Sequence, residues 1–393
     1  MPIKTGIFTI GKDMPWTIME SFMRLMRLFV LFCCTCSAFA ASNLDFLQQL
    51  TLLPGASGFE KPVREAVRAR WQKTLPKVHV DGMGNVIGEA ASETGPRVLL
   101  MAHMDEVGLM VESITPDGFL RVVPLGGIYE ASVFAHRWQI EVPGGRVTAY
   151  SGMDSPHLLT DAERPRTPRE TALFLDIGAR SAEEVQAMGV RVGLPVTPLA
   201  LWSPLTANRI LAKALDDRIG LAVITDVLET LGKHPNHVIA AATVQEEIGL
   251  RGAGTIHAGT RPDVVINIEV GIADDYPKLL AARKGRIALG KGPGLFAYDR
   301  SLIPNTALLE WIYAEARKQG IPVQIEVESG YGEDGAKLQT SGEGVPVINI
   351  GVPVRYAHQE GGIFDTRDYE NTVKLVQQIV KHLDVNVVAK IRE

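Results

Sequence analysis

Hydrophobic and polar positions follow two different periods along the chain, and together they predict helices separated by buried strands. Apolar residues have helical spacing in VREAVRARWQKTL, LDDRIGLAVITDVLETLG, NTALLEWIYAEARKQG and a last segment near residues 367–383. Continuous apolar runs of strand length occur in VLLMA, HVIAAATV, DVVINIEV and PVINIGV. Because such strands are typical of sheets buried on both faces, the pattern predicts an α/β fold in which helices cover a mixed sheet.

Residues 107–204 have a different pattern. Short, valine-rich segments such as GFLRVVPLGG and HRWQIEVPGGRVTAY are separated by turn residues. We therefore expect a small β-rich domain over 107–204, inserted into an α/β domain that comprises residues 41–106 and 205–393.

The first forty residues have the layout of an export signal. Arg24 and Arg27 precede the apolar run LFVLFCCTCSAFA, and small residues precede Ala41. The run is shorter than the roughly 20 residues that span a bilayer, so we expect a cleaved signal over residues 1–40, with an uncleaved anchor as the alternative. The prediction is an exported protein, periplasmic or secreted, without stable membrane association after cleavage.

Composition excludes several classes of site. A chain of 393 residues with 46% hydrophobic and 22% charged residues is typical of a packed globular protein, and a net charge of -5 disfavours nucleic acid as a partner. The three cysteines all lie within the expected signal, at Cys33, Cys34 and Cys36. Disulfides and thiolate chemistry are therefore not expected in the mature chain, and any metal would be held by His, Asp and Glu.

Charged or polar residues directly follow the apolar strands, where the ligand sites of open α/β sheets lie. Asp216 differs in that it begins a predicted helix. The residues that follow the four strands are His103 and Asp105 after VLLMA, Glu246 and Glu247 after ATVQ, Glu269 after DVVINI, and His358 after PVINIGVPVRYA.

Imidazole and carboxylate ligands suit zinc, cobalt or manganese. His103 with one carboxylate and His358 with another would form two half-sites, and a further carboxylate would bridge two cations about 3.5 to 4 Å apart. In this interpretation Glu247 is a ligand, Glu246 is the general base, and Asp105 fixes the tautomer of His103.

Each of these features alone has an ordinary explanation. His103 alone is more often a core or surface histidine, Asp216 a helix cap, and the pair Glu246 and Glu247 a solvated patch. A metal site is favoured because burying charged groups costs free energy, and yet charged groups follow apolar strands four times.

Five motifs carry a resemblance to a known family. In order, AHMDEVGLM, ALDDRIG, QEEIGLRGA, KGPGLFAYDRS and GVPVRYAH resemble the M42 metallo-aminopeptidases, which include tetrahedral and glutamyl aminopeptidases, over about residues 44–385. The resemblance implies removal of N-terminal residues from short peptides by an enzyme with two divalent ions per subunit, zinc or cobalt before manganese. It also implies that the insert mediates dimers, which assemble into dodecamers.

The resemblance also implies a role for each site residue. Asp216 matches the carboxylate that bridges both ions, and Glu246 matches the base that deprotonates the bridging water. Asp105 matches a supporting carboxylate, and the other metal ligands are His103, Glu247, Glu269 and His358.

The sequence departs from the family pattern at three places. Glu269 stands where the family has Asp, YGEDGAK stands near the family's GGGTDAG, and Gln359 and Glu360 stand where the family has Ser and Pro. These changes leave open a two-metal carboxypeptidase or deacylase of related fold, and a catalytically inactive metal-binding or peptide-binding homologue. The preferred N-terminal residue and the native metal are not determined by the sequence.

Overall fold

The computed structural model of the chain describes residues 44–90, 95–160, 173–277 and 287–393. Residues 47–393 form one compact unit. The signal predicted over residues 1–40 lies outside the described residues. Within the described part of the chain, no helix combines the length and the apolar character needed to cross a membrane.

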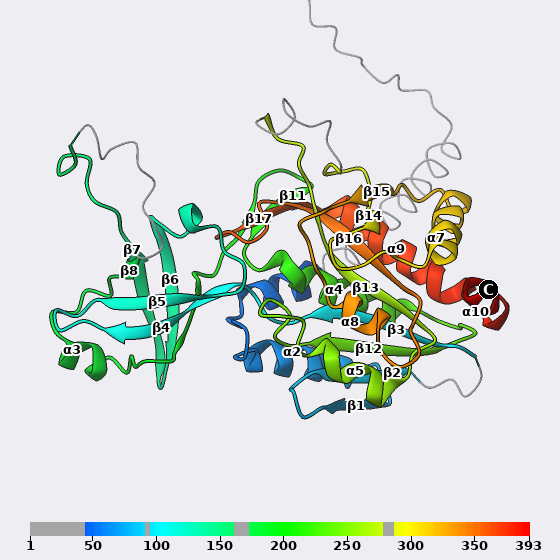
Figure 1. Ribbon diagram of the computed structural model, residues 1–393, viewed down its shortest axis with the longest axis horizontal. Coiled ribbons are helices and arrows are strands. Elements are labelled where there is room, and N and C mark those ends of the chain that lie inside the picture. Colours follow the sequence, from blue (N-terminus) through cyan, green and yellow to red (C-terminus); the bar gives the residue numbers. More distant parts are fainter. Residues whose placement is uncertain (1–43, 91–94, 161–172, 278–286) are drawn as a thin grey trace, which may run out of the picture. The chain divides into compact units, whose positions relative to one another are not determined.

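An eleven-stranded mixed sheet forms the main part of this unit (Figure 1). Nine strands follow the order β1-β2-β12-β3-β13-β16-β17-β11-β10, and β14 joins β15 to β16. The four central strands β12, β3, β13 and β16 are parallel, whereas β2 and β17 pair with them in the antiparallel sense. The strands are β1 (Lys77–Val80), β2 (Val86–Ala90), β3 (Arg97–His103), β10 (Trp202–Pro204), β11 (Arg209–Ala212), β12 (His237–Thr243), β13 (Val264–Ile272), β14 (Gly294–Tyr298), β15 (Gln324–Val327), β16 (Val347–Arg355) and β17 (Gly362–Asp365).

Helices cover both faces of this sheet, which confirms the predicted fold class. On one face α2 (Lys61–Trp71), α4 (Leu215–Thr230) and α9 (Thr366–His382) pack together, and Trp71 Nε1 donates to Thr225 Oγ1 at 2.9 Å. On the other face α5 (Ala253–Thr260) and α8 (Gly335–Gln339) contact each other and the central strands. Two further helices of the large domain are α7 (Thr306–Lys318) and α10 (Val385–Arg392).

The central strands are buried on both sides because their residues are apolar at successive positions. Leu99 and Met101 of β3 pack with Ile256 of α5, whereas Leu100, between them in the sequence, points to the opposite face. Burying both faces in this way requires continuous apolar runs rather than alternation, as the sequence shows.

A second sheet of six strands has the order β7-β6-β9-β4-β5-β8 and its own apolar core, which includes Leu109, Trp138, Ile140 and Val196. All its strands and α3 (Ala182–Ala187) fall within the stretch predicted to be β-rich. The domain limits at 107 and 204, and a role in dimer contacts, stay predictions. The strands are β4 (Gly108–Ile114), β5 (Leu120–Leu125), β6 (His136–Val142), β7 (Gly145–Ser151), β8 (Phe174–Leu175) and β9 (Pro195–Pro198).

Candidate metal centre

The predicted site residues come from strands that are neighbours in the large sheet. His103 is the last residue of β3, and Glu246 and Glu247 follow β12. Glu269 lies within β13, and His358 follows β16. Because these four strands are parallel and adjacent, their carboxyl ends meet at one edge, and all five side chains are brought there.

Asp216 lies between the two histidines. Its Oδ1 is 2.9 Å from Nε2 of His103, and its Oδ2 is 3.2 Å from Nε2 of His358. Although Asp216 is counted in the first turn of α4, its backbone is not helical, with ψ of 106°, and Ala214 before it has a positive φ of 49°. This irregular start directs the carboxylate toward the strand ends instead of along the helix.

The remaining carboxylates complete two groups around Asp216. On one side, Glu269 Oε1 lies 3.8 Å from Nε2 of His103. On the other side, Glu247 Oε2 lies 3.5 Å from Nε2 of His358. Each imidazole therefore has one oxygen of Asp216 and one glutamate oxygen close to the same nitrogen.

The electrostatics of this cluster fit a cation. Asp216 Oδ2 and Glu247 Oε1 are buried and accept no hydrogen bond from the described residues. Burial raises the pKa of Glu247 to about 7. The nearby His358 lowers this pKa, and the carboxylate of Asp216 raises it. Burial also raises the pKa of Glu269 well above its usual range, and Asp217 raises it further. A divalent ion between these oxygens would offset both the burial and the mutual repulsion.

Asp217, the residue after Asp216, is also close enough to take part. Ligand atoms of His103, Asp217 and Glu269 lie within 4.8 Å of one another, as do those of His103, Asp216 and Glu247. Both oxygens of Asp217 are already engaged, however, since Oδ2 accepts from the backbone N of His103 at 3.3 Å and Oδ1 from that of Gly220 at 3.0 Å.

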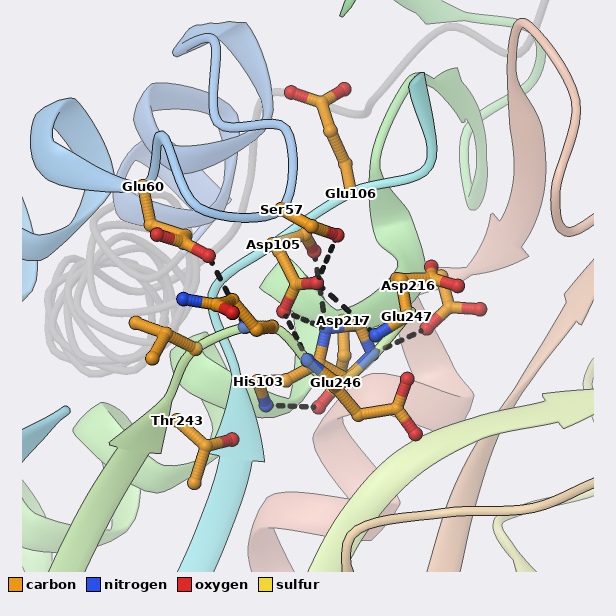
Figure 2. A network of polar contacts seen from close by, with 12 residues as sticks. Ser57, Glu60, His103, Asp105, Glu106, Asp216, Asp217, Thr243, Glu246 and Glu247 are labelled. Carbon is orange, nitrogen blue, oxygen red and sulfur yellow. Dashed lines mark hydrogen bonds and ion pairs between the residues drawn. The ribbon is translucent and has the colours of Figure 1, made fainter. Parts of the chain in front are cut away.

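Asp105 holds the two glutamates through their backbone (Figure 2). Its Oδ1 accepts from the backbone N of Glu246 at 3.0 Å, and its Oδ2 accepts from that of Glu247 at 3.1 Å. Ser57 Oγ donates to Oδ2 at 2.6 Å. The carboxylate is fully buried, so these bonds are made without competition from water.

Both the backbone oxygen and the carboxylate of Asp105 lie near the ring nitrogen Nδ1 of His103. Nδ1 of His103 lies 3.1 Å from the backbone oxygen of Asp105 and 3.6 Å from its Oδ1. A carbonyl acceptor favours the proton on Nδ1 and leaves Nε2, the atom that faces Asp216 and Glu269, free to bind a metal.

Glu246 is the least engaged carboxylate of the group. It is buried and lines the same cavity as the two histidines, but no hydrogen bond to its carboxylate is formed by the described residues. Burial raises the pKa of Glu246 well above its usual range. His103 lowers this pKa, whereas the carboxylates of Asp334 and Glu247 raise it further. A carboxylate with a raised pKa is suited to accept and return a proton near neutral pH.

Two residues that support this edge were not predicted. Both lie in the loop PGASGFE before α2, and both are buried polar residues. Ser57 contacts Asp105, and Glu60 Oε1 accepts from the backbone N of Gln245 at 3.1 Å. Gln245 has a positive φ of 55°, an unfavourable conformation for a residue other than glycine, directly before Glu246. The only sequence signal for these residues is a pair of polar side chains in a glycine-rich loop.

A cavity of about 410 Å³ opens beside the cluster. Its lining includes His103, Asp216, Glu246, Glu247, Glu269 and His358, together with Gly127, Leu250, Arg300, Ser301 and Tyr331. The side chains of the cluster therefore border an open space.

A family model and a known relative both match this chain over most of its length. Residues 84–375 match the family model for M42 glutamyl aminopeptidase. The lysyl aminopeptidase of Pyrococcus furiosus is 33% identical over 344 residues, which are 86% of this chain and 97% of that protein.

Two solved structures are similar over nearly their whole length. A TET aminopeptidase from a marine sediment Thaumarchaeota archaeon has a TM-score of 0.86 and 35% identity, with 90% of this chain and 99% of that chain covered. The TET1 peptidase of Pyrococcus horikoshii has a TM-score of 0.77 and 29% identity, with 86% and 99% covered.

The prediction of an exported protein is wrong, because the M42 relatives that this chain matches over nearly their whole length give the export signal no support. M42 peptidases are metal-dependent, in agreement with the donor set described above. With a family model that covers most of the chain and a fold shared with TET aminopeptidases, this chain belongs to the M42 peptidase family and is a peptide-bond hydrolase.

Proposed function

We propose that this enzyme is a two-metal aminopeptidase that removes N-terminal residues from short peptides. The observation that carries the proposal is the position of Asp216, which has one oxygen close to each histidine. His103, Asp216 and Glu269 would hold one cation, and His358, Asp216 and Glu247 would hold the other. Zinc or cobalt suits these nitrogen and oxygen donors, and manganese is a third choice.

Bound divalent cations would supply Lewis acidity, which makes water a better nucleophile and polarises the peptide carbonyl. The residues of the chain do the rest. Glu246 takes a proton from the attacking water as the new carbon–oxygen bond forms. When the carbon–nitrogen bond breaks, Glu246 returns the proton to the leaving amine. The free α-amine of the substrate would be bound by carboxylates near the cations, Glu269 among them.

Glu269 in place of the family's Asp need not remove the donor from the site. Its longer side chain still brings Oε1 to 3.8 Å from Nε2 of His103. We propose that the carboxylate keeps the ligand role, with its effect on metal preference to be measured. Activity on N-blocked substrates, instead of substrates with a free amine, would favour the carboxypeptidase or deacylase alternative.

The test is Glu246→Gln, with the exposed Glu310→Gln as control. Chromogenic aminoacyl substrates are assayed with zinc, cobalt and manganese in turn, with a chelator as blank. We expect Glu246→Gln to bind as much metal as the wild type and to lose about 10²- to 10⁴-fold in kcat, while Glu310→Gln retains activity. Loss of metal from Glu246→Gln, or unchanged turnover, would contradict the assigned role.

We propose further that the chain forms dimers through residues 107–204 and that dimers assemble into a dodecamer. The TET1 peptidase of Pyrococcus horikoshii can assemble into a tetrahedron or a large octahedral shell. Several large apolar side chains on or near the smaller sheet are exposed, which is typical of a surface that is covered by a partner. Light scattering that finds a monomer would contradict this assembly. The exposed side chains are Val123, Tyr129, Tyr150, Met153, Leu158 and Val192.

A further inference from the structure

One basic residue lines the cavity beside the metal centre. Among the described residues that form its wall, Arg300 is the single lysine or arginine. Its side chain is exposed, and no described residue forms a hydrogen bond or an ion pair with it. An arginine that contacts substrate space and has no internal partner keeps all its donors available to a ligand.

The turn that carries Arg300 is anchored on both sides. Oδ1 of the buried Asp299 accepts from the backbone N of Ser301 and of Leu302, each at 2.6 Å. Oδ2 of Asp299 accepts from Asn349 Nδ2 of β16 at 2.8 Å. The backbone at residue 300 is therefore fixed to the large sheet, and only the Arg300 side chain remains free to move.

The wall of the cavity that Tyr331 contributes is also held by contacts within the fold. Tyr331 donates its hydroxyl to the backbone oxygen of Val270 at 3.2 Å and stacks on Phe296 with ring centroids 5.9 Å apart. Ser301 Oγ accepts from the backbone N of Glu333 at 3.3 Å, which links the two walls. The backbone that carries Arg300 is therefore held at the wall of the cavity, while its side chain can adjust to a ligand.

Charge balance indicates what Arg300 binds. Asp216, Glu246, Glu247 and Glu269 are the carboxylates of the cavity, and two divalent cations would balance their four charges. Among the described lining residues, the guanidinium of Arg300 is then the charged group left for the substrate, and its planar donor fork matches a carboxylate.

We propose that Arg300 binds a carboxylate of the substrate. The inference rests on the proposed aminopeptidase function and adds the chemical class of the preferred substrate. The carboxylate has two sources in short peptides, an acidic side chain at the first residue or the C-terminus of a dipeptide. Family membership does not decide the preferred first residue, since the family model describes a glutamyl aminopeptidase while a similar relative is a lysyl aminopeptidase.

The experiment measures kcat/KM of the metal-loaded enzyme for two sets of substrates. The first set is the p-nitroanilides of Glu, Leu and Lys, and the second is the dipeptide Leu-Leu with its C-terminal amide. The variants are Arg300→Gln, Arg300→Glu and Arg300→Lys. Arg251→Gln is the matched control, because Arg251 is exposed and next to the lining residue Leu250 but does not line the cavity.

Arg300→Gln is expected to lower kcat/KM about 10- to 100-fold for the carboxylate-bearing substrate, the range for a lost charge-assisted hydrogen bond. Leu p-nitroanilide should change less than about 2-fold. Arg300→Lys should retain part of the preference, because it keeps the charge and loses the fork. Arg300→Glu should reverse the preference for the carboxylate-bearing substrate. If the carboxylate is the acidic side chain of the first residue, inhibition by free glutamate should weaken in the same variants.

The outcomes separate the two sources and the two proposals. A loss confined to Glu p-nitroanilide assigns the acidic side chain, and a loss confined to Leu-Leu over its amide assigns the C-terminus. Unchanged ratios in Arg300→Gln and Arg300→Glu, or an equal loss for every substrate, would overturn the role of Arg300. If the wild type hydrolyses none of the substrates, it is the aminopeptidase function that fails.

Discussion

Replacing Asp105 by Asn tests how the glutamate pair is held. The carboxylate accepts one hydrogen bond at Oδ1, from the backbone N of Glu246, and two at Oδ2, from the backbone N of Glu247 and from Ser57 Oγ. Asn has nearly the same volume but one oxygen. Whichever way the amide is turned, one of the two buried backbone N–H groups faces a donor.

The expected cost follows from those bonds. A buried N–H without an acceptor costs about 1 to 3 kcal/mol, and the remaining bonds lose their charge-assisted part. Burial raises the pKa of Asp105, but His103, Ser57 and the Glu246 amide outweigh burial and lower it, so the charged form stabilises the fold. We expect Asp105→Asn to lower the free energy of unfolding by about 2 to 4 kcal/mol. Zinc affinity should fall by about 10- to 100-fold.

Urea denaturation of the metal-free protein, followed by circular dichroism, gives the free energy of unfolding, and competition with a chelating dye gives the zinc affinity. Ser57→Ala is the matched control, because it removes one bond to Asp105 and leaves both glutamate amides paired. Its expected cost is about 1 kcal/mol, with little change in zinc affinity. An Asp105→Asn protein as stable as Ser57→Ala and with wild-type zinc affinity would refute the reasoning.

Two further predictions concern the stability of the fold. Burial raises the pKa of Asp226 to about 7, whereas the unfolded chain releases this proton at about pH 4. Between these values the unfolded state binds fewer protons, so stability falls as pH rises, by up to about 4 kcal/mol. Asp226→Asn should match the wild type near pH 4 and exceed it at pH 8 in urea denaturation; parallel curves would contradict this. Lys213 is fully buried with its Nζ 2.6 Å from Glu106. Lys213→Met should cost about 3 to 5 kcal/mol, against under about 1 kcal/mol for the exposed Lys77→Met, and equal losses would argue against a buried pair.

The main features of the fold were predictable because they follow from local patterns. The apolar runs that became β3, β12, β13 and β16 have the composition of doubly buried strands, and polar residues begin where each run ends. The rule that ligand sites lie beyond the carboxyl ends of parallel strands then directs attention to His103 and Glu247. The ordered motifs add the family, which the comparisons confirm.

Several of the contacts that hold the site in place were not predictable in the same way, even where the residue itself was predicted, as Asp105 was. Asp105 binds the backbone amides of residues more than a hundred positions away, and backbone amides carry no sequence signal. Glu106, Lys213 and Arg218 are charged, which normally indicates the surface, yet they are buried because they neutralise one another. No sequence pattern marks Arg300 as a functional residue, and only the structure shows that it lines the cavity.

The most direct test of the two-metal account is an anomalous-scattering map from crystals soaked in zinc or cobalt salt. The account predicts two strong peaks on either side of Asp216, one beside Nε2 of His103 and Glu269 and the other beside Nε2 of His358 and Glu247. A map without a peak near either imidazole, from crystals that bind the metal elsewhere, would contradict it.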